Sequence, residues 1–194
     1  MKRNPFAPTD FGADSLEVRV SESLVATSDQ TDAELDAAIG EVLRLLRERL
    51  QMDVVFVSEF VNGRRVFRQV AQAPGVGVIA EGESAWLEES WCQRVVDGRL
   101  RQYIADAKRD PAASPLLKDL PFPIGTHIST PLVLSSGEVY GTLCCFSFEA
   151  HGRPNPEDLA KLKLTARLAA QRLETRRQAR PMPASVPDWT LKSR

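Results

Sequence analysis

Residues 52–73 read MDVVFVSEFVNGRRVFRQVAQA, two apolar runs on either side of a turn dipeptide. Its two halves, 52–61 and 64–73, are rich in β-branched and aromatic residues, which favour strands. The dipeptide Asn62-Gly63 between them supplies the two positive-φ positions that a two-residue turn requires. The stretch therefore predicts a β-hairpin.

A second hairpin is predicted further along the chain, where residues 126–134 and 138–148 flank Ser136-Gly137. Residues 139–146 carry no charge, which is typical of a central strand covered on both faces. A brief strand is expected at 103–105.

Two long helices flank these hairpins in the sequence. Thr31 and Glu34 form a capping box, and apolar residues recur behind it at helical spacing as far as Gln51. The last helix begins with Asn155 as its N-cap, followed by a proline and two acids, and runs to about Arg177.

The segment between the hairpins is irregular. Residues 87–96 predict a short helix that ends at Asp97-Gly98, and 110–125 contains four prolines, which exclude regular structure over much of it. A connection this long usually covers a site. The order of elements predicts an α+β fold, with long helices on one face of an antiparallel sheet and segment 74–125 over the other.

Composition excludes several classes of function. The chain has 25 Lys and Arg against 26 Asp and Glu, so no basic excess exists to neutralise a nucleic acid backbone. No apolar run approaches the ~18 residues that span a membrane, and the N-terminus lacks the apolar core of a secretory signal. The three cysteines of the chain, Cys92, Cys144 and Cys145, are expected to be reduced thiols. We therefore expect a cytoplasmic protein that binds neither nucleic acid nor membrane.

Five phrases in the chain resemble one known family. They are VSEFVNGRRVFR (57–68), ESWCQRV (89–95), IADA (104–107), STPL (129–132) and YGTLCCF (140–146). Together with the order of elements, they resemble the GAF domains of bacterial cyclic-di-GMP enzymes and sensor kinases. The resemblance implies a PAS-like sheet of five or six antiparallel strands, with the terminal helices on one face and a ligand pocket on the other. The domain would span 30–178, between an N-terminal arm (1–29) and a flexible tail (179–194).

The resemblance also implies where ligand-binding residues lie. We expect them on the irregular side of the sheet, in the short helix, beside the crossover and on one face of a later strand, with an arginine for an anionic ligand. Trp91 and Tyr103 are equally compatible with ordinary core aromatics, and Asp106 with a turn cap. The predicted set is Arg68, Trp91, Cys92, Tyr103, Asp106, His127 and Ser129.

Thiol catalysis is the alternative to ligand sensing, because some GAF proteins reduce free methionine sulfoxide. Cys144 and Cys145 are adjacent on a strand and point to opposite faces, whereas Cys92 is able to meet either of them across the pocket. The reductase cysteines lie in the loop that corresponds to 110–125, which contains none. We therefore assign no catalytic residue and do not expect an enzyme.

Other GAF chemistries fit the residues poorly. A bilin is usually attached to a cysteine followed by histidine, but Cys92 is followed by Gln93. The signature of cyclic nucleotide phosphodiesterase GAF domains is missing. His127 with two cysteines would give at most three ligands, short of a structural zinc site. We expect neither bilin nor metal, and the cofactor stays unknown.

Assembly is predicted from the last helix. Its residues Leu159, Leu162, Ala166, Ala169 and Leu173 form a heptad-like stripe. GAF domains commonly dimerise through their terminal helices, which favours a homodimer; alternatively, the stripe packs on the sheet of its own chain. Since no output module is found in the sequence, we expect a stand-alone sensor that signals through assembly or through a partner protein. A third possibility is an interaction module without a ligand.

Overall fold

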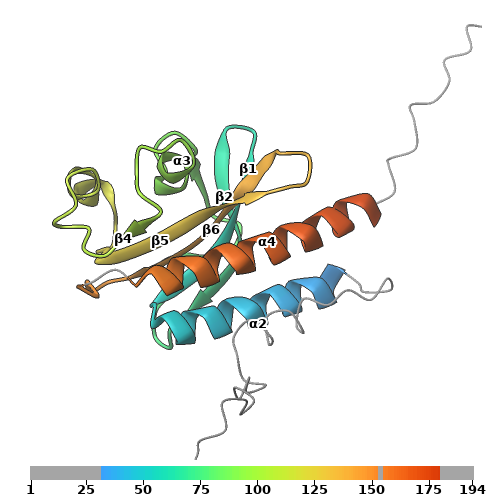
Figure 1. Ribbon diagram of the computed structural model, residues 1–194, viewed down its shortest axis with the longest axis horizontal. Helices are drawn as coiled ribbons and strands as arrows, with labels where there is room; N and C mark the ends of the chain where they lie inside the picture. The colour runs from blue at the N-terminus through green and yellow to red at the C-terminus, as the bar shows by residue number, and fades with distance from the viewer. Residues whose placement is uncertain (1–31, 153–154, 180–194) are drawn as a thin grey trace, which may run out of the picture.

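A computed structural model describes residues 32–152 and 155–179. Six antiparallel strands form one sheet in the order β3-β2-β1-β6-β5-β4. Helices α2 and α4 cover one face, and α3 with the 3₁₀ helix η1 lies over the other (Figure 1). The elements are α2 (Asp32–Leu50), β1 (Val54–Val61), β2 (Arg64–Gln72), β3 (Ser84–Trp86), α3 (Trp91–Val96), β4 (Tyr103–Ile104), η1 (Ser114–Asp119), β5 (Thr126–Val133), β6 (Val139–Ser147) and α4 (Pro156–Ala179).

Both predicted hairpins are present. Asn62 and Gly63 have φ values of 51° and 70° in the β1–β2 turn, as a two-residue turn requires. Strand β6 lies between β1 and β5, so its uncharged sequence is that of a central strand. The α+β fold with six antiparallel strands is thus confirmed. The predicted arm (1–29), Thr31 and the tail beyond residue 179 lie outside the described residues.

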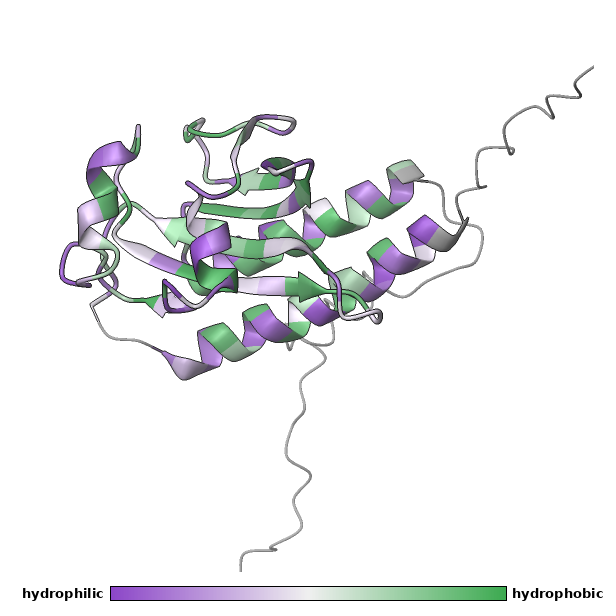
Figure 2. Cartoon of the chain, turned by 90° about the horizontal axis from the view of Figure 1, so that it is seen from above, coloured by the Kyte–Doolittle hydropathy of each residue, from purple (hydrophilic) through white to green (hydrophobic). Residues whose placement is uncertain are grey.

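The long helices pack on the sheet through a continuous apolar core. Leu46 of α2, Leu143 of β6 and Leu162 of α4 are all fully buried in it. Both helices carry hydrophobic and hydrophilic residues in alternation, as Figure 2 shows. Four residues of the α4 stripe are buried in this core and Leu159 packs against it. The stripe therefore serves the sheet of its own chain.

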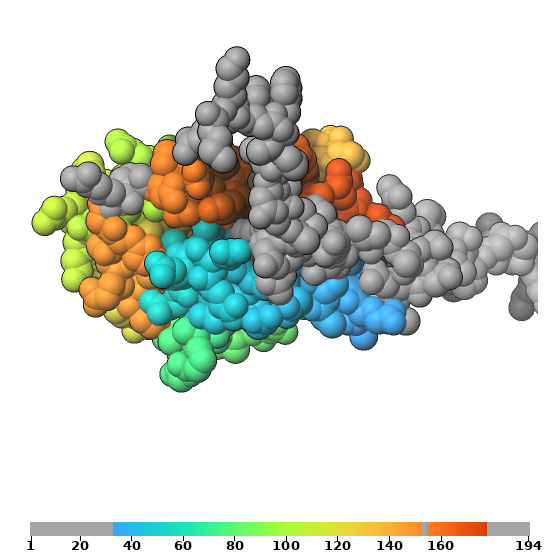
Figure 3. All heavy atoms as spheres, turned by 60° about the horizontal axis from the view of Figure 1, so that its bottom comes forward, coloured from blue at the N-terminus to red at the C-terminus, as the bar shows by residue number. Residues whose placement is uncertain are grey.

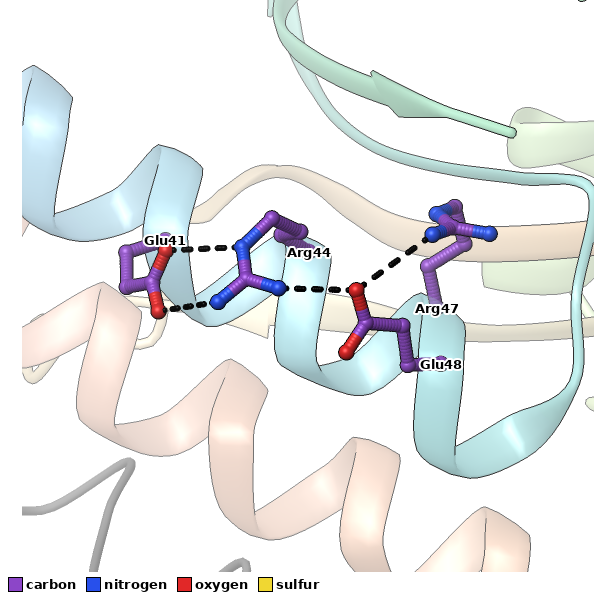
Figure 4. A network of polar contacts seen from close by, with 4 residues as sticks. All are labelled: Glu41, Arg44, Arg47 and Glu48. Carbon is purple, nitrogen blue, oxygen red and sulfur yellow. Dashed lines mark hydrogen bonds and ion pairs between the residues drawn. The ribbon is translucent and has the colours of Figure 1, made fainter. Parts of the chain in front are cut away.

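The outer surfaces of α2 and α4 face the same side of the molecule (Figure 3). On α2, Arg44 donates to Glu41 and, at 2.7 Å, to Glu48, which also lies 3.5 Å from Arg47 (Figure 4). These side chains are nearly half exposed except Arg47, so the pairs contribute little stability. Among the described residues, no helix is long and apolar enough to cross a membrane.

The structure corrects one expectation for the segment between the hairpins and adds two short elements to it. The predicted helix over 87–96 begins only at Trp91, because Ser90 is its N-cap and accepts a hydrogen bond from the Gln93 amide. Strand β3 was not predicted; it is only three residues long and pairs along the edge of β2. The proline-rich stretch contains η1, whose tighter 3₁₀ geometry accommodates Pro115 in its first turn.

Candidate functional site

A cavity of about 700 Å³ lies on the face of the sheet opposite the long helices. Its floor is made by β1, β2, β5 and β6, and its cover by α3 and residues 116–124. The volume is within the range of small-molecule pockets. The sheet, the short helix and the proline-rich segment thus enclose a space large enough for a metabolite.

Aromatic side chains from the sheet and from its cover form part of the apolar wall. Phe56 meets Phe67 edge to face, with ring centroids 4.8 Å apart, and Phe122 from the cover stacks on Phe146 of β6 at 5.2 Å. Trp91 packs against the His127 ring at 5.2 Å. The cover and the sheet therefore contact each other through rings, which offer flat apolar surfaces to a ligand.

Three nitrogen-bearing side chains line the same cavity. Arg65 of β2, Arg94 of α3 and His127 of β5 each have at least one buried nitrogen atom, and within the described ranges none of these atoms has a hydrogen-bond partner. Burial lowers the pKa of His127 to about 4, so its imidazole is neutral at pH 7. Buried polar atoms are normally satisfied. These nitrogen atoms are therefore available for hydrogen bonds to a molecule in the cavity.

Acidic side chains also line the cavity. Glu83, Glu89 and Asp119 are exposed to solvent there. No ion pair joins them to Arg65 or Arg94 in the part of the chain that the structure describes, although the charge of Glu83 raises the pKa of Arg65 against the effect of burial. The cavity thus combines cationic groups with buried nitrogen atoms and acidic groups that are solvated.

A cluster of thiols and hydroxyls is buried where α3 meets the sheet. The Sγ atoms of Cys92 and Cys144 are 3.7 Å apart. Ser129 lies 2.8 Å from the Cys144 sulfur, and Ser58 contacts both Cys92, at 3.9 Å, and Thr142, at 2.8 Å. Of the two thiols, only Cys92 also lines the cavity. The cluster therefore offers the cavity one thiol backed by a second.

The two thiols ionise differently. A hydrogen bond from the Cys144 thiol, the charge of Arg65 and the nearby hydroxyls lower the pKa of Cys92 to about 6. Burial, together with the neighbouring Cys92 thiolate, raises the pKa of Cys144. Burial and the charge of Asp158 also raise the pKa of Cys145, which lies on the helix side of the sheet. Cys92 therefore has the lowest pKa of the three thiols.

The structure brings four of the seven predicted site residues together. Trp91, Cys92 and His127 line the cavity. Ser129 lies beneath it and reaches the site only through its contact with Cys144.

The other three predicted residues lie elsewhere. Arg68 is the extra residue of a β-bulge, because Val57 pairs with Gln69 and Ser58 with Phe67. Its side chain turns away from the cavity to pair with Glu59. Tyr103 packs against the helix-side core.

Asp106 acts as a turn cap. Its carboxylate accepts a hydrogen bond from the Lys108 amide at 3.0 Å and lies 3.4 Å from Arg109. It does not line the cavity. Asp106 is therefore a turn cap, the alternative to ligand binding that the sequence left open.

Sequence reasoning missed Arg65 and Arg94. Strand alternation could have predicted Arg65, because it lies two residues before the buried Phe67 and shares its face of β2. Arg94 lies three residues after Trp91 on α3, and therefore on the same side of that helix. Across 32–152 and 155–179, no group of three or more His, Cys, Asp or Glu side chains is arranged to hold a metal ion.

Comparisons with known proteins agree on the fold. The chain is similar to the GAF domain of a phosphoenolpyruvate-protein phosphotransferase from Acinetobacter, with 13% identity, a TM-score of 0.67, and coverage of 87% of this chain and 95% of that one. The corresponding Coxiella burnetii domain has 21% identity, a TM-score of 0.64, and coverage of 84% and 94%.

A third similar structure is the free methionine-R-sulfoxide reductase of Neisseria meningitidis, in complex with its substrate, with 17% identity, a TM-score of 0.63, and coverage of 85% and 89%. No curated protein matches the chain. The family model described as GAF domain matches residues 32–174, most of the chain. With the six-stranded sheet, the helices on one face and the cavity on the other, the chain belongs to the GAF domain family.

Proposed function

We propose that this protein is a small-molecule sensor of the bacterial cytoplasm that acts in signal transduction rather than catalysis. The cavity carries the proposal, because about 700 Å³ of space is kept between the sheet and its cover instead of being filled by side chains. Membership of the GAF family, many of whose members sense ligands, supports it.

The route of the signal follows from strand β6. Cys144 and Phe146 belong to the core on the cavity side, whereas Leu143 and Cys145 belong to the core under α2 and α4. A ligand that favours one arrangement of α3 and the cover would therefore bias the packing of the long helices. We propose that these helices pass the signal on, in a homodimer or to a partner protein. Since the heptad-like stripe is buried, other residues of α4 would form that contact.

A cavity-filling variant tests the sensor. Ala85 of β3 lines the cavity, whereas Ser84 beside it does not. In a thermal-shift screen of nucleotides and metabolites, a ligand at 100 times its Kd should add about 2.7 kcal/mol of stability. That corresponds to a rise of roughly 5–10 °C in Tm for a chain of this size. The rise should persist in Ser84→Trp and disappear in Ala85→Trp. A ligand that stabilises both variants equally would contradict the assignment of the cavity.

A second candidate function is favoured by the 3.7 Å separation of Cys92 and Cys144. The Cys92 thiolate would take the oxygen of free methionine sulfoxide and become a sulfenic acid, releasing methionine. Attack by Cys144 would then form a disulfide and release water. This function predicts methionine formation in the presence of dithiothreitol, lost in Cys92→Ser and kept in Cys145→Ser. If no methionine is formed, the reductase function is wrong and the proposed sensor function is unaffected.

A further inference from the structure

Arg65 differs from the other two arginines of strand β2. Arg64 donates to Ser84 at 2.9 Å and stacks on Trp86, and Arg68 donates to Glu59 at 2.6 Å. By contrast, Nε and Nη1 of Arg65 are buried, and among the described residues they have no hydrogen-bond partner. The guanidinium groups of Arg64 and Arg68 are thus paired, whereas the two buried nitrogen atoms of Arg65 are not, although buried charged groups are usually paired.

The surroundings of Arg65 offer its two buried nitrogen atoms no hydrogen-bond acceptor among the described residues, although the charges of Cys92, Cys144 and Glu83 partly offset the effect of burial on its pKa. Its guanidinium lies 3.7 Å from the centroid of the Phe67 ring, which supplies a weak attraction to a cation but no hydrogen-bond acceptor. Burial lowers the pKa of Arg65, as expected for a cation removed from water. A buried charge without a partner is costly. A bound molecule with acceptor oxygens would supply the missing hydrogen bonds.

Arg94 extends the same cationic surface from the cover. It lies on α3, two residues after Cys92, whose thiol senses the charge of Arg65. The buried Nε atom of Arg94 likewise has no hydrogen-bond partner among the residues described. One guanidinium thus comes from the sheet and one from the cover. A ligand held by both would tie these two parts of the domain together.

We propose that the cavity binds a small organic anion, whose carboxylate or phosphate oxygens accept hydrogen bonds from Arg65 and Arg94 and whose flat apolar body lies against Trp91 and Phe122. This inference rests on the proposed function, since it names the ligand class of the same cavity. Guanidinium groups match carboxylates and phosphates in geometry and charge. The exposed Glu83, Glu89 and Asp119 disfavour ligands with further negative groups on the apolar body.

Matched probe pairs test the anion. Benzoate and benzamide share a ring and differ in charge, as do phenyl phosphate and phenol. Binding to the full chain is measured by titration calorimetry and by amide chemical shifts in NMR spectra. At least one anion should bind at least tenfold more tightly than its neutral analogue. Comparing the two anions shows whether the carboxylate or the phosphate is preferred.

Single variants then assign the contact. Arg65→Met and Arg94→Met should each weaken binding of the anion at least tenfold. Arg68→Met removes a cation from the same strand but outside the cavity, and should bind as the wild type does. Urea unfolding without ligand should find Arg65→Met at least as stable as the wild type, so that lost binding is not lost folding.

The outcomes separate this inference from the proposed function. Equal binding of charged and neutral probes would overturn the proposal that the ligand is an anion. Unchanged binding in both Arg65→Met and Arg94→Met would overturn it as well. The proposal is also wrong if the metabolite screen yields only neutral or cationic ligands whose binding is lost in Ala85→Trp. In that case the sensor function still stands. If neither the probes nor the screen gives any ligand, both proposals fail.

Discussion

Replacing Gly141 by alanine is expected to lower the free energy of unfolding by about 3 kcal/mol or more, the range of severe steric changes in a core. Gly141 lies on β6 opposite Glu59 of β1, at the centre of the sheet. A Cβ atom there would overlap the carbonyl oxygen of Ser58 and lie 2.7 Å from its carbonyl carbon. These are backbone atoms of a paired strand, so no side-chain rotation relieves the overlap.

Gly141→Ala should also disturb the thiol and hydroxyl cluster beside the cavity. Ser58 and Thr142 pair across β1 and β6 and share a 2.8 Å hydrogen bond beneath Cys92. If β1 moves away from β6 to accommodate a methyl group, this contact is lost along with the ladder hydrogen bonds beside it. Urea unfolding followed by circular dichroism measures the change in stability.

Gly77 provides the matched control. A Cβ atom at Gly77 meets nothing within 4 Å, and its φ lies outside the left-handed region. Gly77→Ala should therefore be neutral or stabilising by up to ~1 kcal/mol, through the unfolded chain. A Gly141→Ala protein within ~0.5 kcal/mol of the wild type would show that β1 and β6 are not as close at this point as described.

Most of the fold could be predicted because long elements carry repeated signals. The α2 helix has an apolar residue at every turn, and the β1–β2 hairpin has Asn62-Gly63 at its turn. Short elements lack such repetition. Residues 87–90 have the composition of a helix, yet Ser90 caps α3 and the residues before it form a turn. Strand β3 exists only because the edge of β2 is there to pair with it.

The site was only partly predictable. Alternation gives the face of a strand residue only while the register is regular. As far as Phe67 it is regular in β2, so alternation puts Arg65 and Phe67 on the cavity face and Arg68 on the other face, where it pairs with Glu59. The bulge at Arg68 changes the face of the residues after it, and sequence alone does not place a bulge. Trp91, Cys92 and His127 were found because the family resemblance places α3 and β5 at the pocket.

Alkylation of Cys92 by iodoacetamide is expected to follow a titration near pH 6. With a pKa of about 6, the rate should rise about tenfold between pH 5 and 7 and hardly change from pH 7 to 8.5. An ordinary thiol, with a pKa of about 8.5, would react more than tenfold faster over that second interval. Mass spectrometry of peptides identifies which cysteine is modified at each pH.

One variant tests the contribution of Arg65 to the low pKa of Cys92, and a second serves as its control. Arg65→Met removes the positive charge that stabilises the Cys92 thiolate, so the midpoint should move to higher pH. Cys145→Ser alters only the helix side of the sheet and should leave the profile unchanged.

Cys144 and Cys145 should stay unmodified until the protein unfolds, because both are buried and the pKa of each is raised. Cys92 itself is almost fully buried, so the reagent must enter through the cavity that it lines. A bound anion should therefore slow alkylation even at pH 8, where the thiolate fraction is already complete. A midpoint near pH 8.5, or alkylation that a saturating anion does not slow, would contradict the arrangement of Arg65, Cys92 and the cavity described above.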